Sequence, residues 1–397
     1  MKRLLVIIGI FISSVSVLPA KSDDGQMKIL SHEAQISLLT CSPSDSDVYT
    51  LFGHTAIRVK DDSLGIDMAF NYGLFDYDTS NFIYRFIKGE TYYKVNAVST
   101  KYFLFDYQYH GRGVSEQILN LTQKEKQDVW VALMLNIQPQ NQTYLYNFLY
   151  NNCATKARDI ILNTIDREVI YGDLDKVQTY RDLLHGCTDV SPWSRFGIDL
   201  IIGSDADKPI TDMQKDFLPA YLEASFRNAG VGNGIPFVVQ EYILLDAQLD
   251  LKPKGKIDDP FIMGCFLLLL TFLITLLNYK RKWLTGGRLF DTFLFMITGI
   301  GGCIIFFLMF FSIHPSVNPN WNFVWLNPLQ FIVAFLFFVK PLQKWIYYYH
   351  FINFVLLLLF LLAWGLIPQQ FGIAFIPYIL AICMRSGVNA VVIRRHK

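Results

Sequence analysis

A cysteine at the start of a predicted helix is the residue of this sequence best suited to chemistry. Cys153 follows Asn151 and Asn152 in the stretch YNNCATKARDI, and asparagine is a favoured N-cap residue. Apolar residues then recur at helical spacing, at Ala157, Ile160, Ile161 and Ile165. The first turn of a helix favours negative charge, so a thiol there tends toward the nucleophilic thiolate. The alternative is a structural cysteine, either buried or in a disulfide.

A nucleophilic thiol needs a base, and histidine is the usual one. The histidines before residue 259 are His32, His54, His110 and His185. We favour His54 because the stretch 48–59 is typical of a turn that leads into a strand, with His54 near its start. Gly53 would let another backbone or a ligand approach closely. A histidine that opens a strand and a cysteine that opens a helix form the pair of thiol acyl-transfer enzymes. His110 is the second choice, and an ordinary sheet histidine is the alternative for His54.

The base in turn needs a group that orients its ring. The segment GIDMAFNYGLFDYD follows the His54 strand and is expected to form its hairpin partner. Asn71 or Asp67 could then return beside His54. We favour Asn71, because a neutral amide orients an imidazole without burying a charge. A simple turn asparagine ahead of Gly73 is the alternative.

Aromatic residues are dense between residues 81 and 110. They could line an acyl-chain groove or lie at a membrane surface, where amphipathic rings settle, or they could form sheet core and edge. The sequence has no HExxH zinc motif, phosphate loop or Gly-x-Ser-x-Gly elbow, so we expect neither metal nor cofactor. Its net charge of +1 gives no indication of nucleic-acid binding.

The first residues have the pattern of a secretory signal. Lys2 and Arg3 precede an apolar run, and small residues end at Ala20. We therefore expect a signal peptide at residues 1–20 and an exported, mixed α+β domain at residues 21–258. This domain contains Cys41, Cys153 and Cys187. We expect Cys153 to be the free thiol and Cys41 to pair with Cys187 if either is paired.

Residues 259–397 are mostly apolar and are expected to form an all-α transmembrane domain of about five helices. The predicted spans are Pro260–Asn278, Leu289–Phe311, Phe323–Val339, Phe351–Ile367 and Phe371–Met384. Basic residues gather in three clusters, at 280–288, 340–344 and 385–397. The two connections between them, SIHPSVNPNWN and PQQFG, contain no Lys or Arg. Since positive charge stays in the cytoplasm, this pattern predicts a cytoplasmic C-terminus and an outer domain on the other side.

Three blocks carry a family resemblance: LLTCSPSDSDVYTLFGHTAIRV, FNYGLFDY and NNCATKARDII. With the membrane region, they resemble the Lnb-type lipoprotein N-acyltransferases of Bacteroidetes. The order of histidine before cysteine also resembles the circularly permuted papain-like thiol enzymes. The resemblance implies that Cys153 is the acyl-accepting nucleophile and His54 its base, whereas Asn71 rests on the hairpin argument alone.

The implied reaction moves an acyl chain from a phospholipid, through a Cys153 thioester, to the N-terminal amine of a diacylated lipoprotein. The implied location is the inner membrane, with several membrane passes and the N-terminal domain in the periplasm. Two alternatives belong to other classes of function. One is an exported Cys–His hydrolase, such as a peptidase or a lipase-like enzyme. The other is a non-enzymatic membrane-anchored assembly protein with a structural Cys153.

Overall fold

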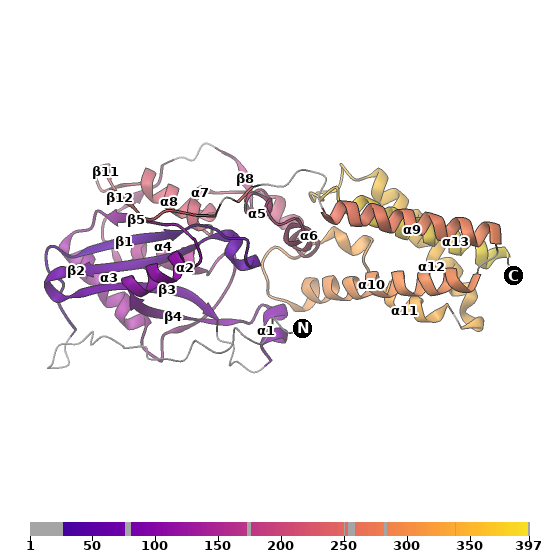
Figure 1. Cartoon of the computed structure of the whole chain (residues 1–397), viewed down its shortest axis with the longest axis horizontal. Coiled ribbons are helices and arrows are strands. Elements are labelled where there is room, and N and C mark those ends of the chain that lie inside the picture. Colours follow the sequence, from indigo (N-terminus) through magenta and orange to yellow (C-terminus); the bar gives the residue numbers. More distant parts are fainter. Residues whose placement is uncertain are drawn as a thin grey trace.

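The computed structural model describes residues 27–75, 81–172, 176–249, 251–252, 259–281, 284–337 and 339–395. The predicted signal peptide and residues 253–258 of the linker lie outside these ranges. Figure 1 shows a sheet-rich α+β domain at one end of the molecule and a helical region at the other. This arrangement confirms the predicted fold class.

A seven-stranded antiparallel sheet forms the centre of the outer domain, in the order β12-β5-β1-β2-β3-β4-β6. Its strands are β1 (Gln35–Cys41), β2 (His54–Asp61), β3 (Ile66–Phe75), β4 (Tyr92–Ser99), β5 (Val114–Leu119), β6 (Thr143–Leu145) and β12 (Val238–Leu245). Two small sheets contain β7 (Val169–Ile170), β8 (Gln178–Thr179), β9 (Pro209–Ile210), β10 (Gly230–Val231) and β11 (Ile235–Pro236).

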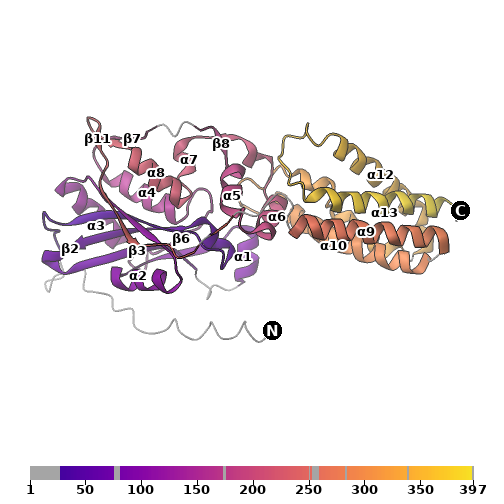
Figure 2. The same cartoon turned by 45° about the horizontal axis from the view of Figure 1, so that its top comes forward.

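Helices cover both faces of the large sheet. The outer-domain helices are α1 (Phe82–Lys88), α2 (Thr100–Tyr109), α3 (Gln123–Asn136), α4 (Cys153–Thr164), α5 (Tyr180–Thr188), α6 (Pro192–Ile201), α7 (Asp212–Lys215) and α8 (Pro219–Asn228). Helices α3, α4 and α8 share one core with the sheet, and α2 packs against the other face. Figure 2 shows α4 and α8 above the sheet and α2 below it.

The apolar face of α4 holds this helix against the strands that contain the predicted site. Ala157 and Ile161 are fully buried and share the main core with Ile57 of β2 and Phe70 of β3. Ile160 and Ile165 pack at the edge of the same core. The helical spacing read from the sequence is therefore confirmed, and the packing fixes the start of α4 beside β2 and β3.

The membrane region contains α9 (Asp259–Arg281), α10 (Leu284–Phe311), α11 (Pro328–Leu336), α12 (Gln343–Leu362) and α13 (Phe375–Arg395). Among the described residues, four helices are long and apolar enough to cross a membrane: α9, α10, α12 and α13. The third predicted span is therefore corrected. Its apolar helix covers only Trp321–Leu336, and the α-helical part begins at Pro328. Nine α-helical residues extend about 14 Å, against roughly 30 Å of hydrocarbon.

Two predicted spans also differ in their bounds. Helix α12 begins at Gln343, before the predicted Phe351, and α13 continues to Arg395, beyond the predicted Met384. Both extensions contain basic or aromatic residues, which an apolar window leaves out although they suit the membrane interface.

The outer domain contacts the membrane region in two places. Helix α1 lies at the end of α10, where the N–H of Ile313 donates to the Lys88 carbonyl at 2.9 Å. Helix α6 packs into the core of the membrane region, with the Phe196 ring 4.9 Å from that of Phe375. The loops that follow α10 and α12 complete the second contact.

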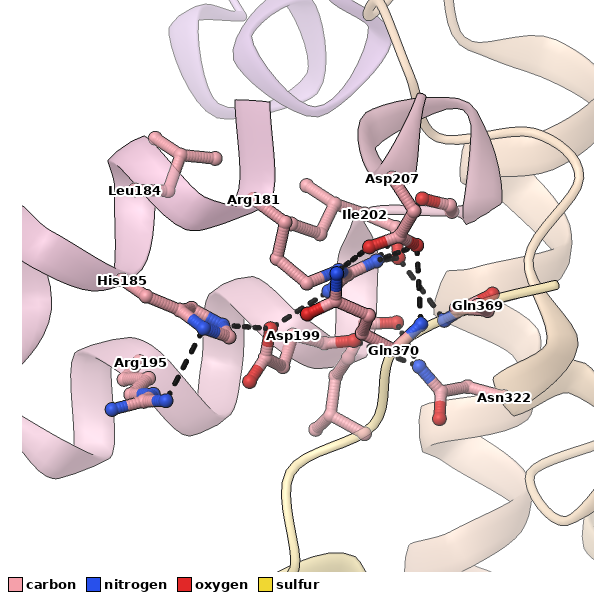
Figure 3. Close-up of polar contacts among 12 residues, drawn as sticks. Arg181, Leu184, His185, Arg195, Asp199, Ile202, Asp207, Asn322, Gln369 and Gln370 are labelled. Carbon is pink, nitrogen blue, oxygen red and sulfur yellow. Dashed lines mark hydrogen bonds and ion pairs between the residues drawn. The ribbon is translucent and has the colours of Figure 1, made fainter. Parts of the chain in front are cut away.

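A buried arginine organises this second contact, as Figure 3 shows. Arg181 donates to Asp199 at 2.7 Å and to Asp207 at 2.6 Å, with its side chain 0% exposed. The Asp199 backbone carbonyl accepts from the Asn322 amide at 2.8 Å, and the Asp207 carboxylate accepts from the Gln370 N–H at 3.2 Å. The ion pairs thus fix the segment from Asp199 to Asp207, to which the loops of the membrane region hydrogen-bond.

Candidate active site

His54 begins β2 after a short 3-10 helix over Val48–Phe52 and a sharp turn at Gly53. Gly53 has φ of +76°, and a Cβ there would lie 2.9 Å from the Cys41 carbonyl oxygen. A side chain would therefore collide with β1. The expectation that Gly53 permits a close backbone approach is confirmed, and the approaching backbone is that of Cys41, which pairs in register with His54.

Asn71 lies beside His54, as the hairpin argument predicted. Strands β2 and β3 pair with Ala56 opposite Asn71, and the Asn71 Oδ1 atom lies 2.6 Å from the His54 Nε2 atom. An amide oxygen accepts, so this contact places the proton of the neutral ring on Nε2 and leaves Nδ1 as the basic nitrogen. Asp67 instead accepts from Arg58 at 2.7 Å.

The end of β3 bends at the site. The pairing of β3 with β4 shifts register between Asn71 and Leu74, which marks a β-bulge or irregularity. Gly73 lies in this stretch with φ of +89°, and a Cβ there would be 3.7 Å from the Cys153 Cβ. Irregularities of this kind often re-aim strands next to active sites. Here the irregularity places Gly73 close to Cys153, with room for no more than ordinary contact at its Cβ position.

Asn152 caps α4 and so fixes Cys153 as its first residue. The Asn152 Oδ1 atom accepts from the N–H groups of Ala154 at 2.9 Å and Thr155 at 3.0 Å. Its amide donates to the carbonyls of Phe148 and Phe217 at 2.8 and 2.7 Å. The cap is buried and anchored on both sides, so the predicted helix start is confirmed.

The Cys153 and His54 side chains form a mutually stabilising pair. Burial acts to raise the pKa of Cys153, but the neighbouring His54 and the N–H groups of Thr55 and Ala154 lower it below its usual value of 9.0. Burial acts to lower the pKa of His54, but the neighbouring Cys153 and the Asn71 hydrogen bond raise it above 6.5. Both directions favour thiolate and imidazolium. Residues His54 and Cys153 are both partly exposed, so the pair lies at the surface of the domain.

The other cysteines have different environments. Among the described cysteines none is in a disulfide, so the suggested Cys41–Cys187 pair is absent. Cys41 is buried under α2 and Cys187 belongs to the separate core around α5 and α6, which explains why they do not meet. Burial raises the pKa of Cys41 to about 12 and that of Cys187 to about 11. Cys153 is thus the cysteine of the outer domain with thiolate character.

The other histidine candidates are exposed or have other partners, and His54 is the histidine that acts on the pKa of Cys153. His110 is exposed at the end of α2, where its Nδ1 atom lies 2.8 Å from the Asp106 carbonyl. His185 contacts Asp199 at 2.8 Å in the network of Figure 3. His32 is exposed before β1. Within the described residues, no group of three or more metal-ligating side chains gathers.

Two tyrosines near the thiol were not foreseen. Burial raises the pKa of Tyr144 and of Tyr146, and the nearby Cys153 raises both further. They precede the cysteine by less than ten residues in the stretch TYLYNFLYNNC. The sequence carries no local signal of this proximity, because the approach of the two rings to the thiol depends on how the loop before α4 folds.

These features define a thiol–imidazole–amide constellation in a sheet domain that is attached to a membrane region. Comparison with protein families agrees with this class. A model described as the Lnb N-terminal periplasmic domain matches residues 23–186, and one described as the Lnb transmembrane domain matches residues 252–397. The two models cover most of the chain, which therefore belongs to the Lnb family.

No curated protein and no solved structure matches the chain significantly. The similarity to papain-like enzymes accordingly remains a resemblance read from the order of His54 and Cys153.

Proposed function

We propose that this Lnb-type protein is a lipoprotein N-acyltransferase of the inner membrane, with Cys153 as nucleophile, His54 as base and Asn71 as the residue that orients His54. The observation that carries the proposal is the pairing of Cys153 with His54, which Asn71 orients through a 2.6 Å contact. Membership of the Lnb family supports the reaction class. The attached membrane region supports lipid substrates.

The first half-reaction acylates the thiol. His54 accepts the Cys153 proton at Nδ1, and the thiolate attacks an ester carbonyl of a phospholipid. The tetrahedral intermediate collapses when the carbon–oxygen bond to glycerol breaks, and imidazolium returns the proton to the departing alkoxide. The products are a lysophospholipid and a Cys153 thioester.

The second half-reaction transfers the acyl chain. The neutral N-terminal amine of a diacylated lipoprotein attacks the thioester carbonyl, and His54 accepts the proton that the nitrogen loses. The carbon–sulfur bond breaks, an amide forms, and Cys153 regains its thiolate. Asn71 keeps the ring in one orientation through both steps.

The start of α4 supplies a donor for the oxyanion of both intermediates. A helix start leaves its first N–H groups without intrahelical acceptors. The capping residue Asn152 occupies those of Ala154 and Thr155, and its own N–H donates to the Thr155 hydroxyl at 2.8 Å. The N–H of Cys153 is the remaining one and lies beside the reacting atom, as an oxyanion donor requires.

Mass spectrometry of lipoprotein N-termini tests the proposal directly. In cells that contain Cys153→Ala or Cys153→Ser in place of the wild type, we expect N-acylated lipoprotein to disappear while the variant stays in the membrane. His54→Ala should have nearly the same effect, and His54→Gln should not restore activity because glutamine accepts no proton. Asn71→Ala should be milder, because one hydrogen bond contributes about 1 kcal/mol, or roughly five-fold in rate.

Three results would contradict parts of the assignment. N-acylated lipoprotein from the Cys153→Ala strain would show that the nucleophile is another residue. Full activity of His54→Ala would transfer the base to His110. Release of free fatty acid alone, from wild-type protein with phospholipid and diacylated lipopeptide, would identify a hydrolase.

A further inference from the structure

Helix α1 presents an unusually apolar surface to the outside of the domain. Its seven residues, FIYRFIK, include Ile83 at 75% exposed, Tyr84 at 55%, Phe86 at 48% and Ile87 at 39%. Soluble surfaces seldom concentrate so many large apolar side chains in so short a segment. The position of α1 indicates what covers them.

Helix α1 is fixed at the outer-domain end of membrane helix α10 (Figure 1). The His314 Nε2 atom, just after α10, lies 2.7 Å from the Phe86 carbonyl. The Tyr84 ring lies 6.2 Å from that of Phe307, which is within α10. These contacts place α1 at the level where a membrane helix leaves the hydrocarbon, which is the level that aromatic side chains favour.

A continuous series of aromatic contacts leads inward from α1. The Phe86 ring lies 6.1 Å from Phe82, and Phe82 lies 6.5 Å from Phe75 at the end of β3. Phe75 lies 4.6 Å from Tyr93 of β4, which stacks on Tyr146 at 4.0 Å. We call these five side chains the aromatic strip.

The inner end of the aromatic strip reaches the candidate nucleophile. Phe75 is two residues beyond Gly73, where an added Cβ would lie 3.7 Å from the Cys153 Cβ. Tyr146 lies in the loop before α4 and interacts electrostatically with the same thiol. Phe75, Phe82 and Tyr146 are partly exposed and Phe86 is 48% exposed, so a ligand can touch these four rings, whereas Tyr93 is buried and supports Phe75 and Tyr146 from behind.

We propose that α1 rests in the outer leaflet of the membrane and that the aromatic strip binds the acyl chain of a phospholipid between the bilayer and Cys153. An ester carbonyl can reach the thiol only if its acyl chain leaves the bilayer, and that chain needs an apolar surface because exposure to water is unfavourable. The strip supplies such a surface along the direct route. The identity of the chain as acyl donor rests on the proposed function, whereas the lipid contact itself does not.

Photocrosslinking tests the lipid contact. Full-length Cys153→Ala protein is reconstituted in vesicles of phosphatidylethanolamine and phosphatidylglycerol that contain a phosphatidylethanolamine with a diazirine in one acyl chain. After illumination and proteolysis, we expect lipid adducts in residues 82–93 and 144–146 as well as in the membrane helices. Adducts confined to residues 259–395 would overturn the proposal.

A matched pair of variants tests the consequence for the reaction. In the double variant Ile83→Asp and Ile87→Asp, α1 carries two charges that the leaflet rejects. We expect acylation of Cys153 from long-chain phospholipid to fall at least ten-fold, with unchanged alkylation of Cys153 by iodoacetamide. The control Ile29→Asp changes an equally apolar residue, 78% exposed, which precedes β1 at the end of the sheet away from His54, and should have no effect.

The outcomes separate this inference from the proposed function. Normal acylation in the α1 double variant would refute the role of α1 and leave the transferase intact. If lipid adducts form on the strip but the wild-type protein never becomes acylated at Cys153, the lipid site is supported and the transferase is refuted.

Discussion

At the scale of single residues, the Cys153–His54 pair makes reactivity depend on pH in a defined direction. Because the pKa of Cys153 is lowered, its thiolate is present below the usual 9.0, and because the pKa of His54 is raised, its imidazolium persists above 6.5. Both shifts favour the ion pair, which is lost at the acid end when the thiolate is protonated and at the alkaline end when the imidazolium loses its proton.

We predict that alkylation of Cys153 by iodoacetamide rises with pH to a midpoint below 9.0. In His54→Ala the positive neighbour is gone, and burial then raises the pKa of the thiol, so the midpoint should move above 9.0. The measurement is the alkylation rate of Cys153 by peptide mass spectrometry across a pH series. An unchanged midpoint in His54→Ala would mean that the two side chains are not coupled.

Much of this site could be predicted from local patterns. Cys153 after an asparagine cap and His54 after a glycine turn each carry their signal within a few residues. Asn71 required one more step, the register of a hairpin, and that register is short-range. Tyr146 and Cys41 approach the site through loop folding and strand pairing across the sheet, which have no local signature.

At the scale of elements, the turn before β2 determines where His54 begins. Gly53 combines φ of +76° with ψ of −163°, a conformation that is essentially restricted to glycine. Gly65 also has a positive φ, of +61°, but with ψ of 31° and no atom within 4 Å of an added Cβ. Gly65 thus provides a comparison in which a positive φ is present without the collision and without the ψ that only glycine adopts.

We predict that Gly53→Ala destabilises the protein by about 3 kcal/mol or more, because strain and the collision with the Cys41 carbonyl add together. The control Gly65→Ala should cost about 1 kcal/mol, since its left-handed conformation is open to other residues. Thermal unfolding of both variants in detergent gives the comparison, and Gly53→Ala should also lose acyl transfer. Equal losses of stability would show that β1 yields to the added methyl group.

Element boundaries in the membrane region were harder to predict than the elements themselves. An apolar window finds Phe323–Val339 but does not show that Pro328, which lacks an N–H, begins the α-helix late. It also misses the start of α12 at Gln343, where lysine and aromatic residues lower the apolarity. Composition determines that a segment enters the bilayer, whereas capping and proline determine how much of it is α-helical.

At the scale of the whole molecule, the Arg181 network holds the segment through which the outer domain hydrogen-bonds to the loops after α10 and α12. Removal of the arginine would leave buried Asp199 with only His185 and Asp207 with only the Gln370 N–H, and loss of one partner from a buried ion pair costs about 3–5 kcal/mol. We predict that Arg181→Met lowers the thermal stability of the full chain and exposes the α5–α6 region to protease. The control Lys208→Met removes an exposed pair with Asp205 and should cost less than about 1 kcal/mol. Similar protease patterns for both variants would rule out this role.

The contacts of the membrane loops also bear on topology. Asn322, after α10, and Gln369, after α12, both hydrogen-bond to the outer domain. Helix α12 is 20 residues long, so its start at Gln343 lies far from the outer-domain side of the membrane region. The chain from Asn322 to Gln343 therefore has to cover the same depth as α12, although its α-helix is short.

We therefore predict five passages through the membrane and a C-terminus on the side opposite the outer domain. A reporter fused after Lys397 should be active only in the cytoplasm, as the clusters of basic residues also indicate. Activity of that reporter in the periplasm would require an even number of passages and would contradict the model.

The double attachment of the outer domain, through α1 and through α6, has a consequence for how the proposed enzyme meets its substrates. A domain held against the bilayer in this way encounters lipids at the effective concentration of the membrane itself, which far exceeds any concentration in free solution. Affinity for an individual donor or acceptor can then be weak without loss of rate, and weak affinity lets the lysophospholipid and the finished lipoprotein leave quickly.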